Sequence, residues 1–246
     1  MRRALFLATL ASLAVPALAA GQDSGWDGRV RIGINGGIQT SDNAIHQAFT
    51  LQKNLEGTPI TADIAVQREP LFDAGLVVRI RGRFGVGVAV SYAMRDINAD
   101  VTAQIPHPFF FSQPRAVTGT AAAGRTETTT HIDAVWMVPS RKVDVLLSVG
   151  PSLFNVTQTL ITDVLYADAY PYDAATFGSA PTATARRTAT GFHVGADVTV
   201  KLSAHVGVGG LLRFSRASAT FTAGTDNSVT TDLGGLQAGG GVRIGF

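Results

Sequence analysis

The chain has 246 residues, with 20 lysines and arginines against 18 aspartates and glutamates, and it contains no cysteine. The lack of cysteine excludes disulfides, thiolate metal sites and a cysteine nucleophile. Two of the arginines lie in the first 20 residues, so the remainder carries 18 charges of each sign. This balance argues against nucleic acid as a partner.

The N-terminus has the pattern of a secretory signal peptide. It has a positive start at Arg2 and Arg3, an apolar stretch too short to span a bilayer, and an Ala-x-Ala cleavage motif ending at Ala19. No later run of 18 apolar residues follows, so a membrane-embedded form requires a closed β-barrel. We therefore predict a signal peptide, a short periplasmic segment and a barrel domain, at residues 1–19, 20–28 and 29–246.

Stretches of about ten residues alternate between apolar side chains and polar or small ones, which is the length and period of tilted membrane-spanning strands. In the third stretch, for example, Val86, Val88 and Val90 alternate with Gly87 and Ala89. The first five strands in chain order are predicted at residues 29–40, 72–80, 85–95, 126–138 and 143–153.

Three further strands are predicted at residues 187–202, 206–221 and 230–246, which brings the total to eight. The last one ends on an aromatic residue, Phe246, and is preceded at alternate positions by Ile244 and Val242. Its other face carries an arginine and several glycines, so one face suits hydrocarbon and the other a polar interior.

The connections alternate in length. Those at residues 81–84, 139–142 and 203–205 are short, whereas most of the others have about twenty to thirty residues. Short periplasmic turns and long extracellular loops are typical of outer-membrane barrels, and this arrangement places both termini in the periplasm. The stretch from Asn43 to Val66 has room for an extra hairpin, which leaves a count of ten strands open.

With its terminal aromatic residue and this loop pattern, the sequence resembles the small eight-stranded outer-membrane barrels, the superfamily that contains the OmpA membrane domain, OmpX and OmpW. The resemblance implies an all-β, eight-stranded antiparallel up-and-down transmembrane barrel in the bacterial outer membrane, without a peptidoglycan-binding domain. It implies that Phe246, Ile244 and Val242 form the signal read by the barrel assembly machinery. Periplasmic chaperones and outer-membrane lipid, including lipopolysaccharide, are the other implied partners.

A period of two also fits a soluble exported barrel, such as a lipocalin-like carrier, with its apolar face inward. The terminal aromatic residue, the alternating loop lengths and the glycine-rich polar face favour the membrane form. In a narrow lumen, glycine leaves room for long charged side chains, and unpaired charges there would be costly. We therefore predict an inward-facing network of paired charges formed by Arg31, Arg79, Arg95, Asp133, Asp144, Asp197, Lys201, Arg213 and Arg243.

The five histidines show no metal-site spacing, and neither a metal nor another cofactor is predicted. His131 and His193 fall on predicted inward faces. Along single strands, His131 is near enough to Asp133 for a weak electrostatic contact, whereas His193 is too far from Asp197 for a hydrogen bond.

Some barrels of this size modify lipid A with a serine and a histidine, but the spacing here indicates no such pair, and we predict no enzymatic activity.

The long loops carry aromatic clusters at residues 109–111 and 166–177, which fit either a recognition surface for an extracellular ligand or rim aromatics at the headgroup level. Trp136 and Phe246 are interpreted as girdle residues near the short turns. Ala62, Ile64 and Val66 keep the parity of the second strand and would extend it upward.

These patterns favour a non-enzymatic outer-membrane protein with a structural or surface-interaction role and a lumen closed by charged side chains. An eight-stranded barrel is only wide enough for its own side chains, which favours the closed form. The alternative is a narrow channel for small solutes, and the third hypothesis is a lipid A-modifying enzyme.

Overall fold

The computed structural model describes residues 29–40, 44–65, 68–138, 140–223 and 227–246. The predicted signal peptide and the segment 20–28 therefore lie outside the described residues. Among the described residues, no helix is long and apolar enough to cross a bilayer.

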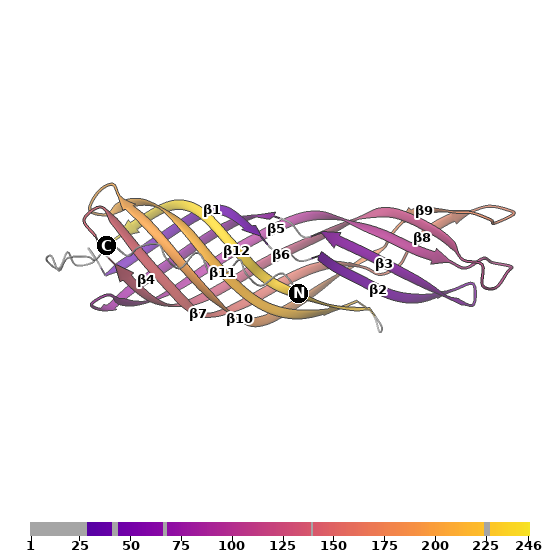
Figure 1. Cartoon of the computed structure of the whole chain (residues 1–246), viewed down its shortest axis with the longest axis horizontal. Helices are drawn as coiled ribbons and strands as arrows, with labels where there is room; N and C mark the ends of the chain where they lie inside the picture. Colours follow the sequence, from indigo (N-terminus) through magenta and orange to yellow (C-terminus); the bar gives the residue numbers. More distant parts are fainter. Residues whose placement is uncertain (1–28, 41–43, 66–67, 139, 224–226) are drawn as a thin grey trace, which may run out of the picture.

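Eight strands form a closed antiparallel ring, in which each strand pairs with the next ring strand along the chain and the last pairs with the first (Figure 1). The fold class predicted from the alternating pattern is therefore confirmed. The strands in ring order are β1 (Val30–Thr40), β4 (Arg68–Arg81), β5 (Phe84–Ile105), β6 (Arg115–Val138), β7 (Val143–Ile161), β10 (Thr182–Lys201), β11 (Val206–Thr222) and β12 (Ser228–Gly245).

The short connections gather at one end of the ring. Gly82 occupies a left-handed position, with φ of 59°, in the turn between β4 and β5. The carbonyl of Phe246 accepts hydrogen bonds from the backbone N–H groups of Arg29 (2.6 Å) and Val30 (3.1 Å). The two ends of the described chain therefore meet at the short-turn end, where β12 closes the ring against β1 (Figure 1).

Both faces of the strands change polarity partway along the molecule, as β7 shows. Near the short turns, Leu147 and Val149 point outward and are 40% and 56% exposed, while Ser148 and Ser152 are buried inside. Beyond Leu153 the outward positions 155, 157 and 159 are polar, and the inward ones are apolar except for Gln158. We call the first part the barrel section. The rest is the extension, formed by residues 96–105, 115–124, 154–161, 182–191, 216–222 and 228–235 with strands β2, β3, β8 and β9.

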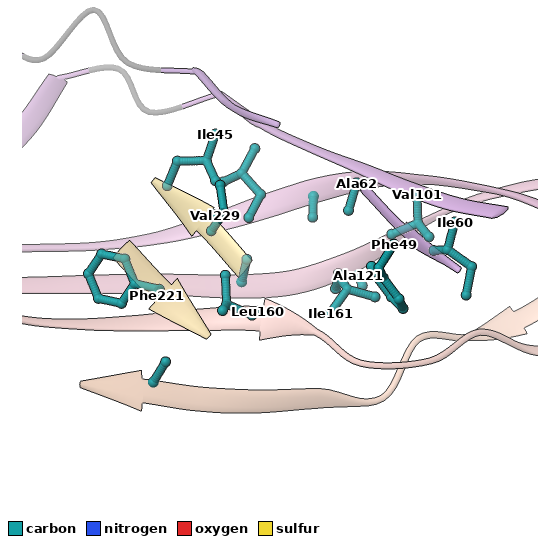
Figure 2. Packing of buried hydrophobic residues seen from close by; sticks show 14 of the residues in the cluster. Ile45, Phe49, Ile60, Ala62, Val101, Ala121, Leu160, Ile161, Phe221 and Val229 are labelled. Atoms are coloured by element: carbon teal, nitrogen blue, oxygen red, sulfur yellow. The ribbon is translucent and has the colours of Figure 1, made fainter. Parts of the chain in front are cut away.

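The extension has an apolar interior of its own. Phe154, Leu160 and Phe221 are fully buried there. Figure 2 shows Phe221 of β11, Val229 of β12 and Leu160 of β7 in the same buried cluster. Apolar side chains leave water when they turn inward, so this inverted polarity is that of a water-exposed β domain. The barrel section is suited to hydrocarbon and the extension to water.

The reversal explains why most predicted strands were too short. β5 continues ten residues beyond the predicted end at Arg95, and β7 continues from Leu153 to Ile161. About ten residues suffice to cross a bilayer at a tilt. The remaining alternation, with apolar residues inward, therefore lies beyond the strand ends that the sequence predicts.

Two hairpins lie outside the ring. The first consists of β2 (Ala44–Lys53) and β3 (Glu56–Ala65), and β3 pairs with the upper part of β5. The extra hairpin that the sequence left open is therefore present, but the ring keeps eight strands. The expected upward continuation of the second strand through Ala62 and Ile64 is wrong: both lie on β3, and both are fully buried in the apolar interior of the extension. The second hairpin is β8 (Leu165–Asp168) and β9 (Ala175–Ser179), which pair with each other.

Glycines at the seam, where β12 pairs with β1 to close the ring, serve two purposes. Gly33 leaves space for a charged side chain, since a Cβ there would lie 3.3 Å from Cδ of Arg243, as the sequence interpretation proposed. At Gly241 the neighbour is backbone instead, because a Cβ would lie 1.8 Å from the carbonyl oxygen of Ile34. This glycine allows β1 and β12 to approach each other closely.

We expect Gly241→Ala to lower the free energy of unfolding by about 1–3 kcal/mol, since the two backbones at the seam must move apart. Gly36→Ala is the matched control on the facing strand, because a Cβ at Gly36 meets nothing within 4 Å. Urea unfolding of the refolded protein measures both effects. Equal midpoints for the two variants would contradict the close approach described at Gly241.

Candidate functional site: the polar interior of the barrel section

A buried aspartate joins two cations near the short-turn end. Asp144 is 1% exposed, and Arg31 NH2 donates to its Oδ2 at 2.5 Å. Nζ of Lys201 lies 3.1 Å from Oδ1 of the same carboxylate. Because the three residues come from β1, β7 and β10, this carboxylate links three strands across the interior.

Two further ion pairs lie deeper in the lumen. Arg243 of β12 binds Asp197 of β10, with Nε donating to Oδ2 at 2.9 Å. Arg213 of β11 donates from NH1 to Oδ2 of Asp73 on β4 at 2.7 Å, and both residues are buried. Since β4 and β11 stand three places apart in the ring, the second pair spans the interior.

The other residues of the predicted network are placed differently. Arg79 and Arg95 are half-buried, and Arg95 donates to the backbone carbonyl of Arg68. Asp133 is buried and pairs with His193, with 2.7 Å between Oδ1 and Nε2.

Sequence reasoning missed a second polar group at the upper end of the barrel section. Arg125 NH2 donates to Oε2 of Glu127 at 2.8 Å, and Gln39 donates to Oε1 of the same carboxylate at 3.1 Å. Gln237 donates to Gln39 at 2.8 Å. Glu127 and Asp73 lie at inward positions of the predicted strands 126–138 and 72–80. A list of every charged residue at an inward position would therefore have included both. Arg125 precedes its predicted strand by one residue.

Two histidines and two serines form a continuous hydrogen-bonded chain in the middle of the lumen. Oγ of Ser152 lies 2.8 Å from Nδ1 of His131 and 2.9 Å from Nδ1 of His193. At the other end, Oγ of Ser91 lies 3.1 Å from Nε2 of His131. The two imidazole rings meet edge to face, with centroids 4.8 Å apart.

One assignment of protons satisfies every link with both imidazoles neutral. Ser91 donates to His131, His131 donates to Ser152, Ser152 donates to His193, and His193 donates to Asp133. The sequence-based prediction concerned histidine–aspartate pairs along single strands. The hydrogen bonds in the structure instead cross from β5 through β6 and β7 to β10. Gly150 of β7 borders His193, and a Cβ there would lie 3.4 Å from Cε1 of the ring.

The Asp133–His193–Ser152 part of this chain contains the residue types of a hydrolytic triad, but its surroundings differ from those of an accessible nucleophile. Ser152 is 3% exposed, and its hydroxyl lies between two imidazole nitrogens. A nucleophile needs a position beside it for the reacting atom. Within the described ranges, no group of three or more His, Asp or Glu residues could hold a metal ion.

A small cavity of about 60 Å³ lies between the ion pairs and this chain, and Asp73, Asp133, Asp197 and Arg213 line it. Its size suits a few water molecules rather than an organic solute.

The far end of the extension is an aromatic tip that rests on a buried arginine. Phe109, Phe110 and Phe111 are 58–69% exposed and follow the upper end of β5. Arg115 donates to the carbonyls of Pro106 (3.0 Å) and Tyr172 (3.1 Å), which joins the two long loops. The phenylalanines lie beyond Ile105, ten residues past the polarity reversal on β5, so they are not rim aromatics at the headgroup level.

The ring is closed, its interior is polar, and a belt of exposed apolar side chains surrounds the barrel section, including Trp136 (43%) and Phe246 (63%). The fold is that of an eight-stranded transmembrane β-barrel. Ile244 and Val242 of the predicted assembly signal lie on the outward face of β12, paired with β1 and β11.

Solved structures similar to this chain include OprG from Pseudomonas aeruginosa, with a TM-score of 0.46 and 10% identity over 89% of this chain and 97% of that one. Neisserial surface protein A has a TM-score of 0.41 and 14% identity, covering 88% and 97%. The outer-membrane protease OmpT from Escherichia coli has a TM-score of 0.48 and 7% identity, covering 90% and 98%. No family model and no curated protein matches the sequence. At these identities no binding or catalytic property is carried over to this chain.

Proposed function

We propose that the protein is a non-enzymatic β-barrel of the bacterial outer membrane, with both termini in the periplasm. In this proposal its lumen is closed by charged side chains, and its extension presents a surface for interaction. The observation that carries the proposal is the Asp73–Arg213 pair, which crosses the lumen at 2.7 Å between strands three places apart in the ring. The histidine and serine chain and the Arg125–Glu127 group add two further sets of polar side chains to the lumen.

The aromatic tip supports the interaction role. Three consecutive exposed phenylalanines are more apolar surface than a solvated loop requires, and such patches mark binding sites. Outer-membrane lipid with lipopolysaccharide, the assembly machinery, periplasmic chaperones and an extracellular ligand at the tip are the proposed partners. The outward apolar positions of β12 and its terminal Phe246 support recognition by the assembly machinery.

The closed lumen is tested by arabinose flux into liposomes that contain the refolded protein, with the heat-dependent gel shift as the folding control. We expect no flux above empty liposomes. The double variant Asp73→Ser, Arg213→Ser removes the pair that crosses the lumen, and we expect it to admit solute. Flux through the unaltered, folded protein would instead support the narrow channel. Hydrolysis of lipid A that is lost in Ser152→Ala would support the enzyme.

A further inference from the structure

A hollow of about 350 Å³ lies on the outer wall over β6, β7 and β10, across the boundary between the barrel section and the extension. The polar side chains that line it occupy paired positions on the three strands: Thr128 pairs with Asn155, and Asn155 with Thr188. One step higher, Thr126 pairs with Thr157 and Thr157 with Arg186. All these positions have the parity of the outward-facing apolar residues lower on the same strands.

The height of the hollow follows from the polarity reversal. On β10 the highest outward apolar residue is Phe192, and Thr188 lies four residues above it. At 3.3 Å per residue and a tilt of about 40°, four residues correspond to roughly 10 Å. The hollow therefore begins where the hydrocarbon ends and the headgroup layer of the outer leaflet starts.

The lining is positive and rich in hydrogen-bond donors. Among the residues that line it, Arg186 has the outward parity, and no carboxylate is present. The neighbouring Arg187 has the opposite parity, and its Nε donates to the carbonyl of Thr220 on β11 at 3.0 Å, on the side of β10 away from β7. The Thr188 hydroxyl donates to Oδ1 of Asn155 at 2.8 Å, which leaves the Asn155 NH₂ group to donate to a ligand. Guanidinium, amide and hydroxyl groups together suit a phosphate attached to a sugar.

We propose that this hollow binds the phosphorylated sugar headgroup of an outer-leaflet glycolipid, with Arg186 on the phosphate and the threonines and Asn155 on neighbouring hydroxyls. The proposal uses the membrane placement of the barrel but is independent of whether the lumen is closed. It assigns the lipid-binding role to three strands of the wall rather than to the loops.

The test uses native mass spectrometry of the refolded protein in detergent with bisphosphorylated lipid A as the probe. We expect Arg186→Gln to weaken lipid A binding about tenfold or more, the loss that accompanies removal of a charge-assisted hydrogen bond. Arg187→Gln is expected to weaken binding less than Arg186→Gln, since Arg187 has the opposite parity and contacts β11. Removal of both phosphates from lipid A should abolish the difference between the unaltered protein and the variants.

The matched control is Arg216→Gln, since Arg216 pairs with Phe192 in the register of β11 but binds Asp232 at 2.6 Å and lies outside the hollow. It should bind lipid A like the unaltered protein. The proposal is overturned if Arg216→Gln loses as much affinity as Arg186→Gln, if dephosphorylated lipid A binds equally well, or if millimolar inorganic phosphate displaces the lipid. A normal heat-dependent gel shift in every variant separates these outcomes from misfolding, and the flux result tests the closed lumen separately.

Discussion

Asp144→Leu should lower the free energy of unfolding by about 3–5 kcal/mol, the cost of leaving a buried charge without its partner. The carboxylate is 1% exposed and contacts both Arg31 and Lys201, so its removal leaves two cations in the interior. Urea titration of the refolded protein in micelles, followed by the fraction of heat-resistant folded band, measures the change.

The matched control is a solvent-exposed ion pair with a similar N–O distance. Asp232 lies 2.6 Å from Arg216, and the two side chains are 39% and 58% exposed. Such surface pairs contribute about 0.2–1 kcal/mol, so Asp232→Asn should shift the unfolding midpoint only slightly. A loss for Asp144→Leu that is no larger than the loss for Asp232→Asn would show that the buried ion pairs do not hold the barrel together.

Phe154→Ala should cost about 3–5 kcal/mol, the usual loss when a buried phenylalanine is truncated and a cavity remains. Phe154 is fully buried in the apolar interior of the extension, just above the polarity reversal on β7. We expect the loss to appear mainly in the extension, because the barrel section keeps its own ion pairs and its contact with lipid. Trypsin cleavage at arginines of the extension should therefore begin at lower urea concentrations, while the barrel section stays protected.

Thr184→Ala serves as the control, since Thr184 is exposed on the extension part of β10. Surface changes of this kind usually stay within about 0.5 kcal/mol. If Phe154→Ala left tryptic cleavage of the extension unchanged, the apolar cluster would not be what holds the extension together.

The alternating pattern was enough to predict the ring of eight strands, because each strand of the barrel section has lipid on one side and a polar interior on the other. The C-terminal strand is the clearest case, with Ile244 and Val242 outward and Arg243 inward. The three short turns are confirmed for the same reason, since β4 ends at Arg81 and β5 begins at Phe84. A period of two fixes the side on which a residue lies.

The pattern did not determine which residues meet across the lumen. Asp133 and His193 are 60 residues apart and lie on strands separated by β7, so their contact depends on the stagger between three strands. Stagger is set by the packing of the whole ring. The extension was missed for a different reason: its apolar residues face inward, so the rule that apolar residues face outward no longer applies beyond Leu153.

The length of β6 has a consequence for access from outside the cell. Fifteen residues separate Thr130, where the outward face of β6 becomes polar, from Arg115 near the tip. At 3.3 Å per residue and a tilt of about 40°, they raise the tip about 40 Å above the hydrocarbon. In the orientation proposed above, with both termini in the periplasm, Phe109, Phe110 and Phe111 therefore stand far out in the layer of surface saccharides, where a shorter barrel would be covered. A large partner that cannot penetrate that layer, such as an antibody or a protein on another cell, can still reach them.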